Sequence, residues 1–370
     1  MYLNHLALTN FKNYESAEMD LSMKVNCFVG NNAAGKTNIL DAIYYLSFCK
    51  SYFNAADNQN IRHEADYFTV HGTYKGQEKG EMKISCVQKR GMKKSFRYNK
   101  KEYDRLADHI GKIPLVMISP YDRDLINEGS DVRRKYLDGV ISQFDWLYLS
   151  DVIDYNKALL QRNTLLKMFA DRGYYDETSL LVWNEKIVEL GTRMFDARKK
   201  FLTEFNPLFE EYYNYLSENR EQVEIIYESQ LSLNPLGDLL LESIEKDRML
   251  RYTTCGPHKD DLVFMINGYP VKKFGSQGQQ KTFVVAIKLA QFEYTRRAVG
   301  FKPILLFDDI FDKLDDNRVE KIVHLVNEDN FGQVFITDTQ RQRIESIFKG
   351  VNIDHKIFRV ADKKVTATDE

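Results

Sequence analysis

The 370-residue sequence predicts an α/β fold whose parallel core sheet is interrupted by an antiparallel β subdomain and by a mainly helical lobe. Strand and helix patterns alternate from Ile304 onward, which is typical of a parallel sheet with helices on its faces. Residues 68–98 alternate between apolar and polar side chains with turn signals between the runs, which indicates antiparallel strands. Between Pro120 and Pro235 the only proline is Pro207, and helical periodicity dominates there.

The core is therefore expected in two halves, since its two strand–helix regions lie far apart in the chain. We place the first half and the β subdomain in residues 1–120, the helical lobe in 121–250 and the second half in 251–370. This length accommodates two domains. The expected strands are 2–9, 25–29, 304–307, 333–336 and 357–360, and the expected helices are 37–49, one from Asp316 and one from Gln340.

Composition narrows the class of protein. Hydrophobic residues make up 43% of the chain, enough for a packed core, yet no apolar run approaches the roughly 20 residues that span a membrane. The N-terminus lacks the pattern of a signal peptide, and the four cysteines form no CxxC pair, which favours reduced thiols in a cytoplasmic protein. With a net charge of −2, any DNA-binding face must be a local basic patch.

A phosphate-binding loop is predicted after the strand at 25–29. Residues 30–37 match the pattern GxxxxGKT and lie between an apolar strand and an amphipathic helix, a context that makes a chance match in an unrelated loop the weaker alternative. Lys36 should neutralise the β- and γ-phosphates of ATP, and Thr37 should supply a hydroxyl to Mg²⁺. The nucleotide-binding residues are expected to be Gly30, Asn31, Asn32, Ala33, Ala34, Gly35, Lys36, Thr37 and Asn38.

Two carboxylates, Asp308 and Asp309, follow the apolar strand at 304–307. Ligands of parallel sheets bind at the carboxyl ends of the strands. Asp308 is therefore expected to hold Mg²⁺, and Asp309 to orient or deprotonate the attacking water. The alternative is a strand that ends by chance in acidic loop residues.

A second anion site is predicted ahead of the long helical pattern that contains Val284 and Ile287. Its candidates are Ser276, Gly278 and Gln279, because a hydroxyl, backbone N–H groups and a helix dipole there point at the same anion. A plain helix cap at Ser276 would also explain this segment.

The order of these motifs resembles the ATP-binding-cassette superfamily, and within it the chromosome-maintenance and DNA-repair ATPases. The order is a phosphate loop, a long insertion, an S-x-G-x-Q signature, an acidic strand and then Leu314-Asp315. The chain is more closely similar to the RecF family of bacterial recombination mediators. The segments that carry this similarity are residues 8–14, 30–32, 133–138, 160–163, 256–261 and 276–280.

This resemblance implies a Mg²⁺-dependent, DNA-stimulated ATPase that forms a head-to-tail homodimer with ATP. Ser276 and Gly278 of one subunit would contact the γ-phosphate bound by the other, and Asp315 would lie where the two sites communicate. The implied partners are DNA at single-strand/double-strand junctions or duplex beside gaps, and a RecR-type mediator that helps load RecA. The implied location is the cytoplasm, at the nucleoid. The alternative is an SMC-like chromosome-maintenance ATPase without a mediator role.

Several assignments stay open at this level. The family usually has an arginine where this chain has Phe53, and Arg62 is the nearest basic alternative for sensing phosphate. The basic stretch 89–101, with Phe96 and Tyr98 interleaved, is either a DNA contact or a solvated hairpin tip. Arg133 and Arg134 are either an exposed helix face, a DNA guide or a brace of the dimer. Thr337 and Thr339 either contact the γ-phosphate or cap a turn.

Overall fold

The computed structural model describes residues 1–54, 56–76, 80–218, 220–310, 316–327, 330–348 and 353–368. The chain divides into two compact units: unit 1 is Met1–Asp122 with Gln291–Glu370, and unit 2 is Arg123–Ala290. The sequence analysis placed the borders of the helical lobe after residues 120 and 250. Residues 251–290, which it assigned to the second half of the core, belong to unit 2 in the structure. Within the described ranges, no helix combines the length and the apolar character needed to cross a membrane.

Unit 1 contains the parallel sheet that the alternating patterns predicted. The strand order is β15-β14-β3-β13-β12-β8, and only β15 runs antiparallel to its neighbour. The strands are β3 (Val25–Val29), β8 (Leu115–Ile118), β12 (Ile304–Phe307), β13 (Val334–Asp338), β14 (His355–Ala361) and β15 (Lys364–Ala367). Every residue of β3, β8, β12 and β13 is buried, as expected for parallel strands covered on both faces.

The antiparallel subdomain of unit 1 is also confirmed. Its order is β2-β1-β4-β5-β6-β7. The strands are β1 (Tyr2–Phe11), β2 (Tyr14–Asp20), β4 (Tyr67–Lys75), β5 (Glu81–Lys89), β6 (Ser95–Tyr98) and β7 (Lys101–Glu102). Helix α1 (Lys36–Phe48) shares one apolar core with both sheets, in which Phe11, Tyr45 and Phe68 meet edge to face. The helix that follows the phosphate loop is thereby packed against both sheets.

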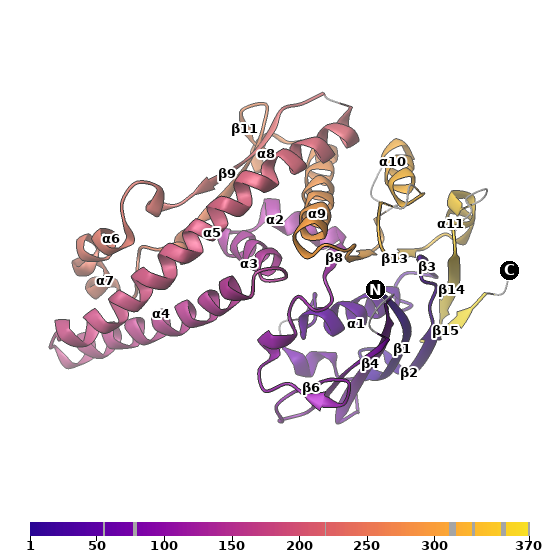
Figure 1. Cartoon of the computed structure of the whole chain (residues 1–370), viewed down its shortest axis with the longest axis horizontal. Coiled ribbons are helices and arrows are strands. Elements are labelled where there is room, and N and C mark those ends of the chain that lie inside the picture. Colours follow the sequence, from indigo (N-terminus) through magenta and orange to yellow (C-terminus); the bar gives the residue numbers. More distant parts are fainter. Residues whose placement is uncertain are drawn as a thin grey trace. The chain divides into compact units, whose positions relative to one another are not determined.

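Unit 1 also contains helices α10 (Asp316–Asn327) and α11 (Arg341–Phe348), close to the positions that the sequence predicted. They follow strands β12 and β13 in the chain, and Figure 1 shows both in the yellow-orange C-terminal part. The carboxyl ends of β3, β12 and β13 meet at one edge of the sheet because these strands are parallel and adjacent. Gly30, Asp308 and Asp338 are consequently neighbours.

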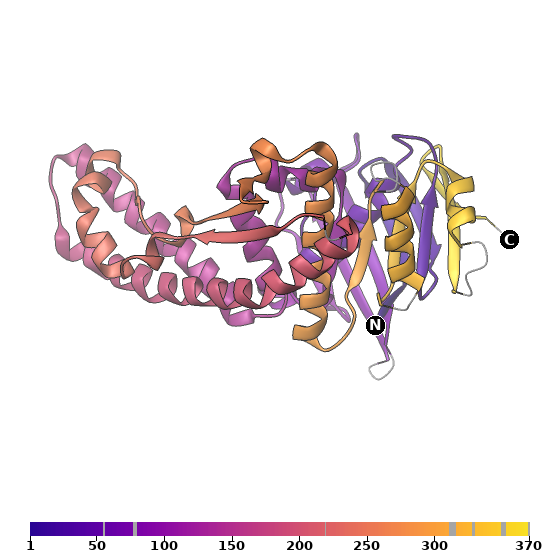
Figure 2. The same ribbon diagram turned by 90° about the horizontal axis from the view of Figure 1, so that it is seen from above.

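Unit 2 is mainly helical, as the long proline-poor pattern predicted. Helices α4 (Trp146–Arg172) and α5 (Glu177–Ser217) form a long antiparallel hairpin, visible in both Figure 1 and Figure 2. Asp145 and Asp176 cap their N-termini by accepting hydrogen bonds from backbone N–H groups. The shorter helices are α2 (Asp124–Asn127), α3 (Ser130–Ile141), α6 (Leu236–Glu242), α7 (Ile244–Leu250) and α8 (Val271–Phe274).

The sequence did not predict the three-stranded sheet of unit 2. Strands β9 (Val223–Glu228), β10 (Asp261–Ile266) and β11 (Tyr269–Pro270) pair in the order β11-β10-β9. Only the short helix α8 separates this sheet from the signature segment at the start of helix α9 (Gln277–Val299).

Buried ion pairs fix the segment 256–261 inside unit 2. The Arg198 guanidinium is almost fully buried and donates to carboxylate oxygens of Asp260 and Asp138. Arg133 forms a bidentate pair with Asp261, and Arg134 donates to the backbone carbonyl of Asp260. The structure therefore gives Arg133 and Arg134 a role that the sequence analysis did not consider, an internal brace of this unit.

Candidate nucleotide-binding site

The phosphate loop leaves β3 at Gly30 and enters α1 at Lys36. A Cβ atom at Gly30 would lie 2.2 Å from the carbonyl oxygen of Val360, so only glycine allows the loop to pass β14 this closely. The tip between β1 and β2 supports the loop from the other side. There, the Tyr14 hydroxyl donates to the carbonyl of Gly35 at 3.1 Å, and the Asn13 amide donates to the carbonyl of Ala34 at 3.3 Å.

Lys36 lies within the loop rather than in solvent. Its Nζ donates to the carbonyl of Gly30 at 2.8 Å and to that of Asn31 at 3.1 Å, and the residue is only 4% exposed. Asn38 in the first turn of α1 donates to Asn13 at 2.6 Å. The loop thus presents a positive charge and a helix N-terminus at one point, the arrangement that binds phosphate.

The two halves of the site meet at Asp308. The Thr37 hydroxyl donates to Asp308 Oδ1 at 2.9 Å, although 271 positions separate the two residues in the chain. The Thr337 hydroxyl lies 3.0 Å from the same oxygen and 3.4 Å from Asp309 Oδ1, and it accepts from the Asp309 N–H at 2.8 Å. Thr337 therefore orders both carboxylates, while contacts of Thr337 and Thr339 with the γ-phosphate stay a prediction.

A magnesium ion fits this corner of the site. The pKa of Asp308 is raised to about 6, first by burial and also by the charge of Asp309, while the hydrogen bond from Thr37 acts to lower it. A cation beside the carboxylate would favour its ionised form. A carboxylate and a hydroxyl are ligands that Mg²⁺ accepts while it keeps several waters and phosphate oxygens. No group of three or more His, Cys, Asp or Glu side chains suited to a metal occurs among the described residues.

A hollow of 550 Å³ in unit 1 borders the phosphate loop and is the candidate place for the nucleoside. It is lined by Lys12, Asn13, Asn38, Asn54, Gln59, Ile61, Arg62, His63 and Lys363. Arg62, the basic residue considered for sensing phosphate, lies there with its guanidinium near Asn10 and Glu15. The Phe53 ring instead lies under the Lys12 ammonium, which forms an ion pair with the buried Asp41 at 2.6 Å.

The signature segment forms the start of α9 in unit 2. Ser276 Oγ accepts from the Gln279 N–H at 3.2 Å, and Gln279 Oε1 accepts from the Ser276 N–H at 2.6 Å, which is a reciprocal capping box. The Gln279 amide also donates to Glu221 at 2.6 Å, and the Tyr213 hydroxyl donates to the same carboxylate. Gln279 and Glu221 thus hold the segment in place. Ser276 accepts from the N–H groups of Gln279 and Gln280, so the N–H groups of Gln277 and Gly278 are the ones at the start of α9 that precede any helical acceptor.

The structure brings together only part of the predicted set. Gly30, Lys36, Thr37, Asp308 and Asp309 lie at one edge of the sheet in unit 1. Ser276, Gly278 and Gln279 lie in unit 2, and Asp315 with Leu314 falls outside the described residues. Sequence reasoning missed the roles of Asn13, Tyr14 and Glu221, although the first two stand in the segment 8–14 that it had noted.

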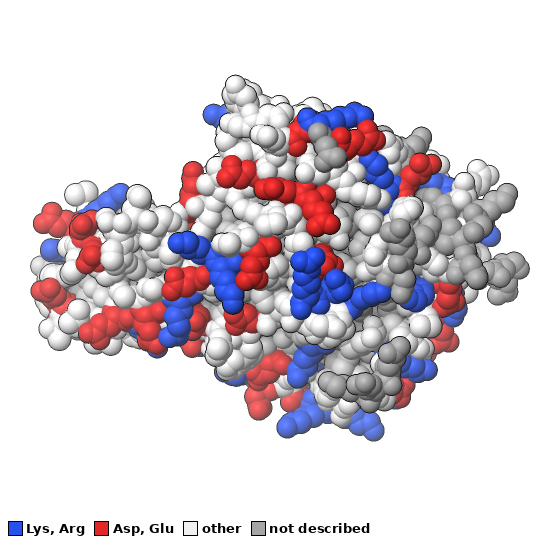
Figure 3. Space-filling model, turned by 45° about the horizontal axis from the view of Figure 1, so that its top comes forward, with Lys and Arg blue, Asp and Glu red and all other residues white. Residues whose placement is uncertain are grey.

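The basic stretch 89–101 is only partly exposed to solvent. Lys94 is nearly buried and forms an ion pair with Asp57 at 2.8 Å, and Phe96 is a buried core residue. The remaining cations of this stretch are exposed at positions 89, 90, 93, 97, 100 and 101. On the face drawn in Figure 3, basic and acidic side chains are interspersed. Both alternatives, a phosphate-backbone contact and a solvated hairpin tip, stay open for these exposed cations, whereas Lys94 and Phe96 are held inside the subdomain.

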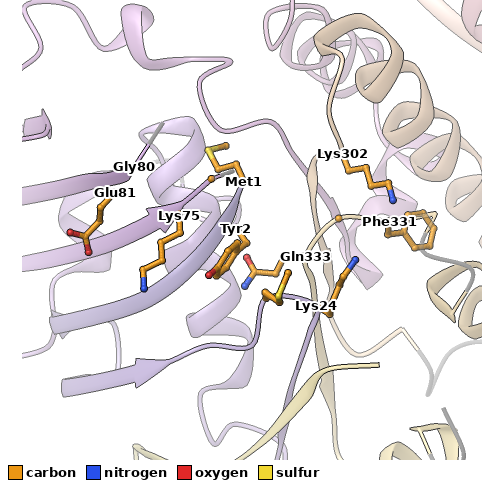
Figure 4. Close-up of a pocket in the computed structure, with 12 residues that line it drawn as sticks. Met1, Tyr2, Lys24, Lys75, Gly80, Glu81, Lys302, Phe331 and Gln333 are labelled. Carbon is orange, nitrogen blue, oxygen red and sulfur yellow. The ribbon is translucent and has the colours of Figure 1, made fainter. Parts of the chain in front are cut away.

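A larger hollow of 750 Å³ lies elsewhere in unit 1 (Figure 4). Its lining includes Lys24 and Gln333, which immediately precede β3 and β13, so it lies at the amino-terminal edge of the parallel sheet. None of the predicted site residues lines it. Size alone therefore does not identify the functional pocket of this chain.

Lowering the pH is expected to destabilise unit 2 through His258. Burial lowers the pKa of this histidine to about 4, and its ring bonds the Tyr155 hydroxyl and the Thr253 carbonyl. Because the folded pKa lies below the ordinary 6.5, the stabilisation is complete above pH 6.5 and is lost as the pH falls toward 4. Between pH 7 and 5 the free energy of unfolding should fall by about 2 kcal/mol at most from this residue.

Urea unfolding at pH 7 and pH 5 measures this effect. Both tryptophans, Trp146 and Trp183, lie in unit 2, so their fluorescence follows its unfolding. His258→Gln should show a smaller loss of stability at pH 5 than the parent. The same loss in both proteins would contradict the assignment.

The strand–loop–helix site at the edge of a covered parallel sheet defines the class of P-loop nucleotide-binding proteins. A family model described as the RecF/RecN/SMC N terminal domain matches residues 2–363. The DNA replication and repair protein RecF of Flavobacterium johnsoniae is 51% identical over 360 residues, covering 97% of this chain and 100% of that protein. RecF of Phocaeicola vulgatus is 49% identical over 371 residues, covering 100% and 99%.

Solved structures agree with these relatives. A structure of the recombination mediator protein RecF with ATP, in the RecFOR pathway, superposes with a TM-score of 0.90 at 31% identity and covers 100% of this chain and 98% of that one. An Smc head bound to a winged-helix domain of ScpA shares the fold, with a TM-score of 0.60 at 16% identity, covering 100% and 98%. The chain belongs to the RecF family, whose fold is that of the ABC-type ATPases.

Proposed function

We propose that this chain is a Mg²⁺-dependent, DNA-stimulated ATPase that closes on DNA as an ATP-bound head-to-tail homodimer. In this role it acts as a recombination mediator at single-strand gaps, together with a RecR-type partner that helps RecA loading. The observation that carries the ATPase assignment is the contact between Thr37 and Asp308, which joins the phosphate loop to the acidic strand. The relatives named DNA replication and repair protein RecF support the mediator role.

Each residue has a defined task in this proposal. Lys36 and the loop N–H groups bind the β- and γ-phosphates, and Thr37 with Asp308 would hold Mg²⁺, which supplies charge neutralisation to the triphosphate. Asp309, held by Thr337, orients the attacking water or accepts its proton.

The second subunit completes the site. Its Ser276 hydroxyl and the N–H groups of Gln277 and Gly278 approach the γ-phosphate, and the N-terminal dipole of the long helix α9 adds to the attraction. ATP then belongs to both subunits at once and stabilises the dimer by linkage. Hydrolysis removes the contacts to the γ-phosphate and releases the clamp, so the ATPase cycle times the DNA-bound state. DNA contact places the protein at the nucleoid in the cytoplasm.

Ser276→Arg is expected to abolish ATP-dependent dimerisation, because a bulky cation replaces the small cap that faces the γ-phosphate. Light scattering coupled to gel filtration, with and without ATP·Mg²⁺, measures this directly. The parent should change from its monomer mass of 43.4 kDa to twice that mass with ATP, while Ser276→Arg stays monomeric.

The matched control is Ser232→Arg, which makes the same change at an exposed serine of unit 2. It should dimerise like the parent. A parent that stays monomeric under every condition would remove the clamp mechanism and leave a P-loop ATPase without it. ATPase rates with gapped duplex and without DNA test the DNA stimulation separately.

A further inference from the structure

Two exposed aromatic side chains lie beside the signature segment. Tyr269 in β11 and Phe274 at the end of α8 pack ring against ring with centroids 5.2 Å apart. They are nevertheless 59% and 63% exposed, so most of this ring surface faces solvent. The two elements lie next to each other close to the start of α9 (Figure 1). An exposed aromatic pair of this kind is typical of an interaction surface.

The pair is fixed relative to Ser276. The buried Gln280 donates to the carbonyl of Gly275 at 3.1 Å and to that of Val271 at 3.4 Å, so it ties α8 to the first turn of α9. A Cβ atom at Gly275 would lie 2.8 Å from the Val271 carbonyl oxygen, so glycine is needed for this tight link. Only one residue stands between Phe274 and Ser276, so their Cα atoms are at most about 7 Å apart.

The nucleoside hollow of unit 1 lacks such a surface. Its described lining residues are polar or charged apart from Ile61. They include no Phe, Tyr or Trp, and the imidazole of His63 is their single ring. Bases gain stability by stacking on aromatic rings. As far as the chain is described, the base side of the site is thus incomplete within one subunit.

We propose that Tyr269 and Phe274 of one subunit contact the nucleoside of the ATP bound by a second copy of this chain. This inference rests on the proposed head-to-tail dimer, since a Ser276 hydroxyl on the γ-phosphate carries its aromatic neighbours toward the ribose and base of the same nucleotide. Lys272 and Lys273, which stand between Tyr269 and Phe274 in the chain and are both exposed, give this surface a positive charge that favours approach to a triphosphate. The Tyr269 and Phe274 rings form an aromatic platform, and its occupant is the partner's nucleotide.

Phe274→Ala tests the platform. The ATP-dependent dimer should become at least about tenfold weaker by sedimentation or light scattering, because stacking on each base is lost. The affinity of the monomer for nucleotide should not change when Phe274→Ala is added to Ser276→Arg, a variant that is expected to stay monomeric. Phe274→Tyr keeps a ring and should restore the dimer. The triphosphate of 2-aminopurine riboside, whose fluorescence falls on stacking, should be quenched in the parent dimer and less so in Phe274→Ala.

The matched control is Tyr174→Ala in the turn between α4 and α5. Tyr174 is also half exposed and also packs on another ring, that of Phe169, and its removal should leave the dimer unchanged. A Phe274→Ala dimer as tight as the parent, unchanged quenching, or weakened binding to the monomer would each overturn the inference. If Ser276→Arg loses the dimer but Phe274→Ala keeps it, the inference fails and the proposed function stands. A parent that stays monomeric with ATP would remove both the inference and the proposed dimer.

Discussion

Lys36→Arg is expected to reduce ATP hydrolysis by at least about 100-fold, even though the positive charge is kept. The Lys36 ammonium fits between two loop carbonyls at 2.8 and 3.1 Å, and the residue is almost fully buried. A planar guanidinium is wider and carries its donors in a fixed fork, so it cannot occupy the same position without displacing the loop. The charge would then lie away from the γ-phosphate at the moment of transfer.

Phosphate release at saturating ATP measures this prediction, and binding of a fluorescent ATP analogue separates affinity from turnover. Lys24→Arg makes the same change at the opposite edge of the sheet, and its rate should equal that of the parent. Parental turnover by Lys36→Arg would remove the assignment of the phosphate loop.

The parts of the site that lie in one continuous segment could be predicted from sequence. The loop at 30–37 stands between an entirely buried strand and a helix, and the pattern of apolar residues alone shows both neighbours. The strand at 304–307 was predicted with its observed bounds, because four consecutive apolar residues before two carboxylates are typical of a buried parallel strand. The phosphate loop and the two carboxylates then meet at the Thr37–Asp308 contact, because both follow the carboxyl ends of strands that run parallel in one sheet.

The parts that depend on distant contacts could not be predicted. Strand β9 pairs with β10 across more than 30 intervening residues, so no hairpin turn announces that pairing, although Asn267-Gly268 forms the turn between β10 and β11. Arg133 and Arg134 look like an exposed charged face until Asp261 and Asp260 are brought beside them. Lys94 likewise belongs to a basic run in the sequence, but its side chain is nearly buried in an ion pair with Asp57.

Ser276 shows a different limit of sequence reasoning. The sequence posed a helix cap and an anion site as alternatives, but the capping box makes them compatible. The cap fixes the geometry of the first turn, and the remaining N–H groups of that turn are the donors that an anion would use. A cap in this position therefore does not count against a functional role.

Asp309→Asn is expected to slow hydrolysis by about 10² to 10⁴-fold while ATP still closes the dimer. The amide has nearly the shape of the carboxylate, so the hydrogen bond from the Asp309 N–H to Thr337 and the positive φ of 44° can both be kept. What is lost is the acceptor for the proton of the attacking water. Since only hydrolysis removes the contacts across the subunits, the dimer should outlive that of the parent.

Light scattering after a chase with excess ADP measures the lifetime of the dimer directly. Asp308→Asn is the sharpest comparison, because it changes the neighbouring carboxylate that would hold Mg²⁺ and contacts Thr37. That variant should bind ATP·Mg²⁺ poorly and form little dimer, whereas Asp309→Asn should accumulate it. If Asp309→Asn stayed monomeric with ATP, the γ-phosphate would not be shared between subunits. If it turned over at the parental rate, the base would have to be sought elsewhere among the residues around the γ-phosphate.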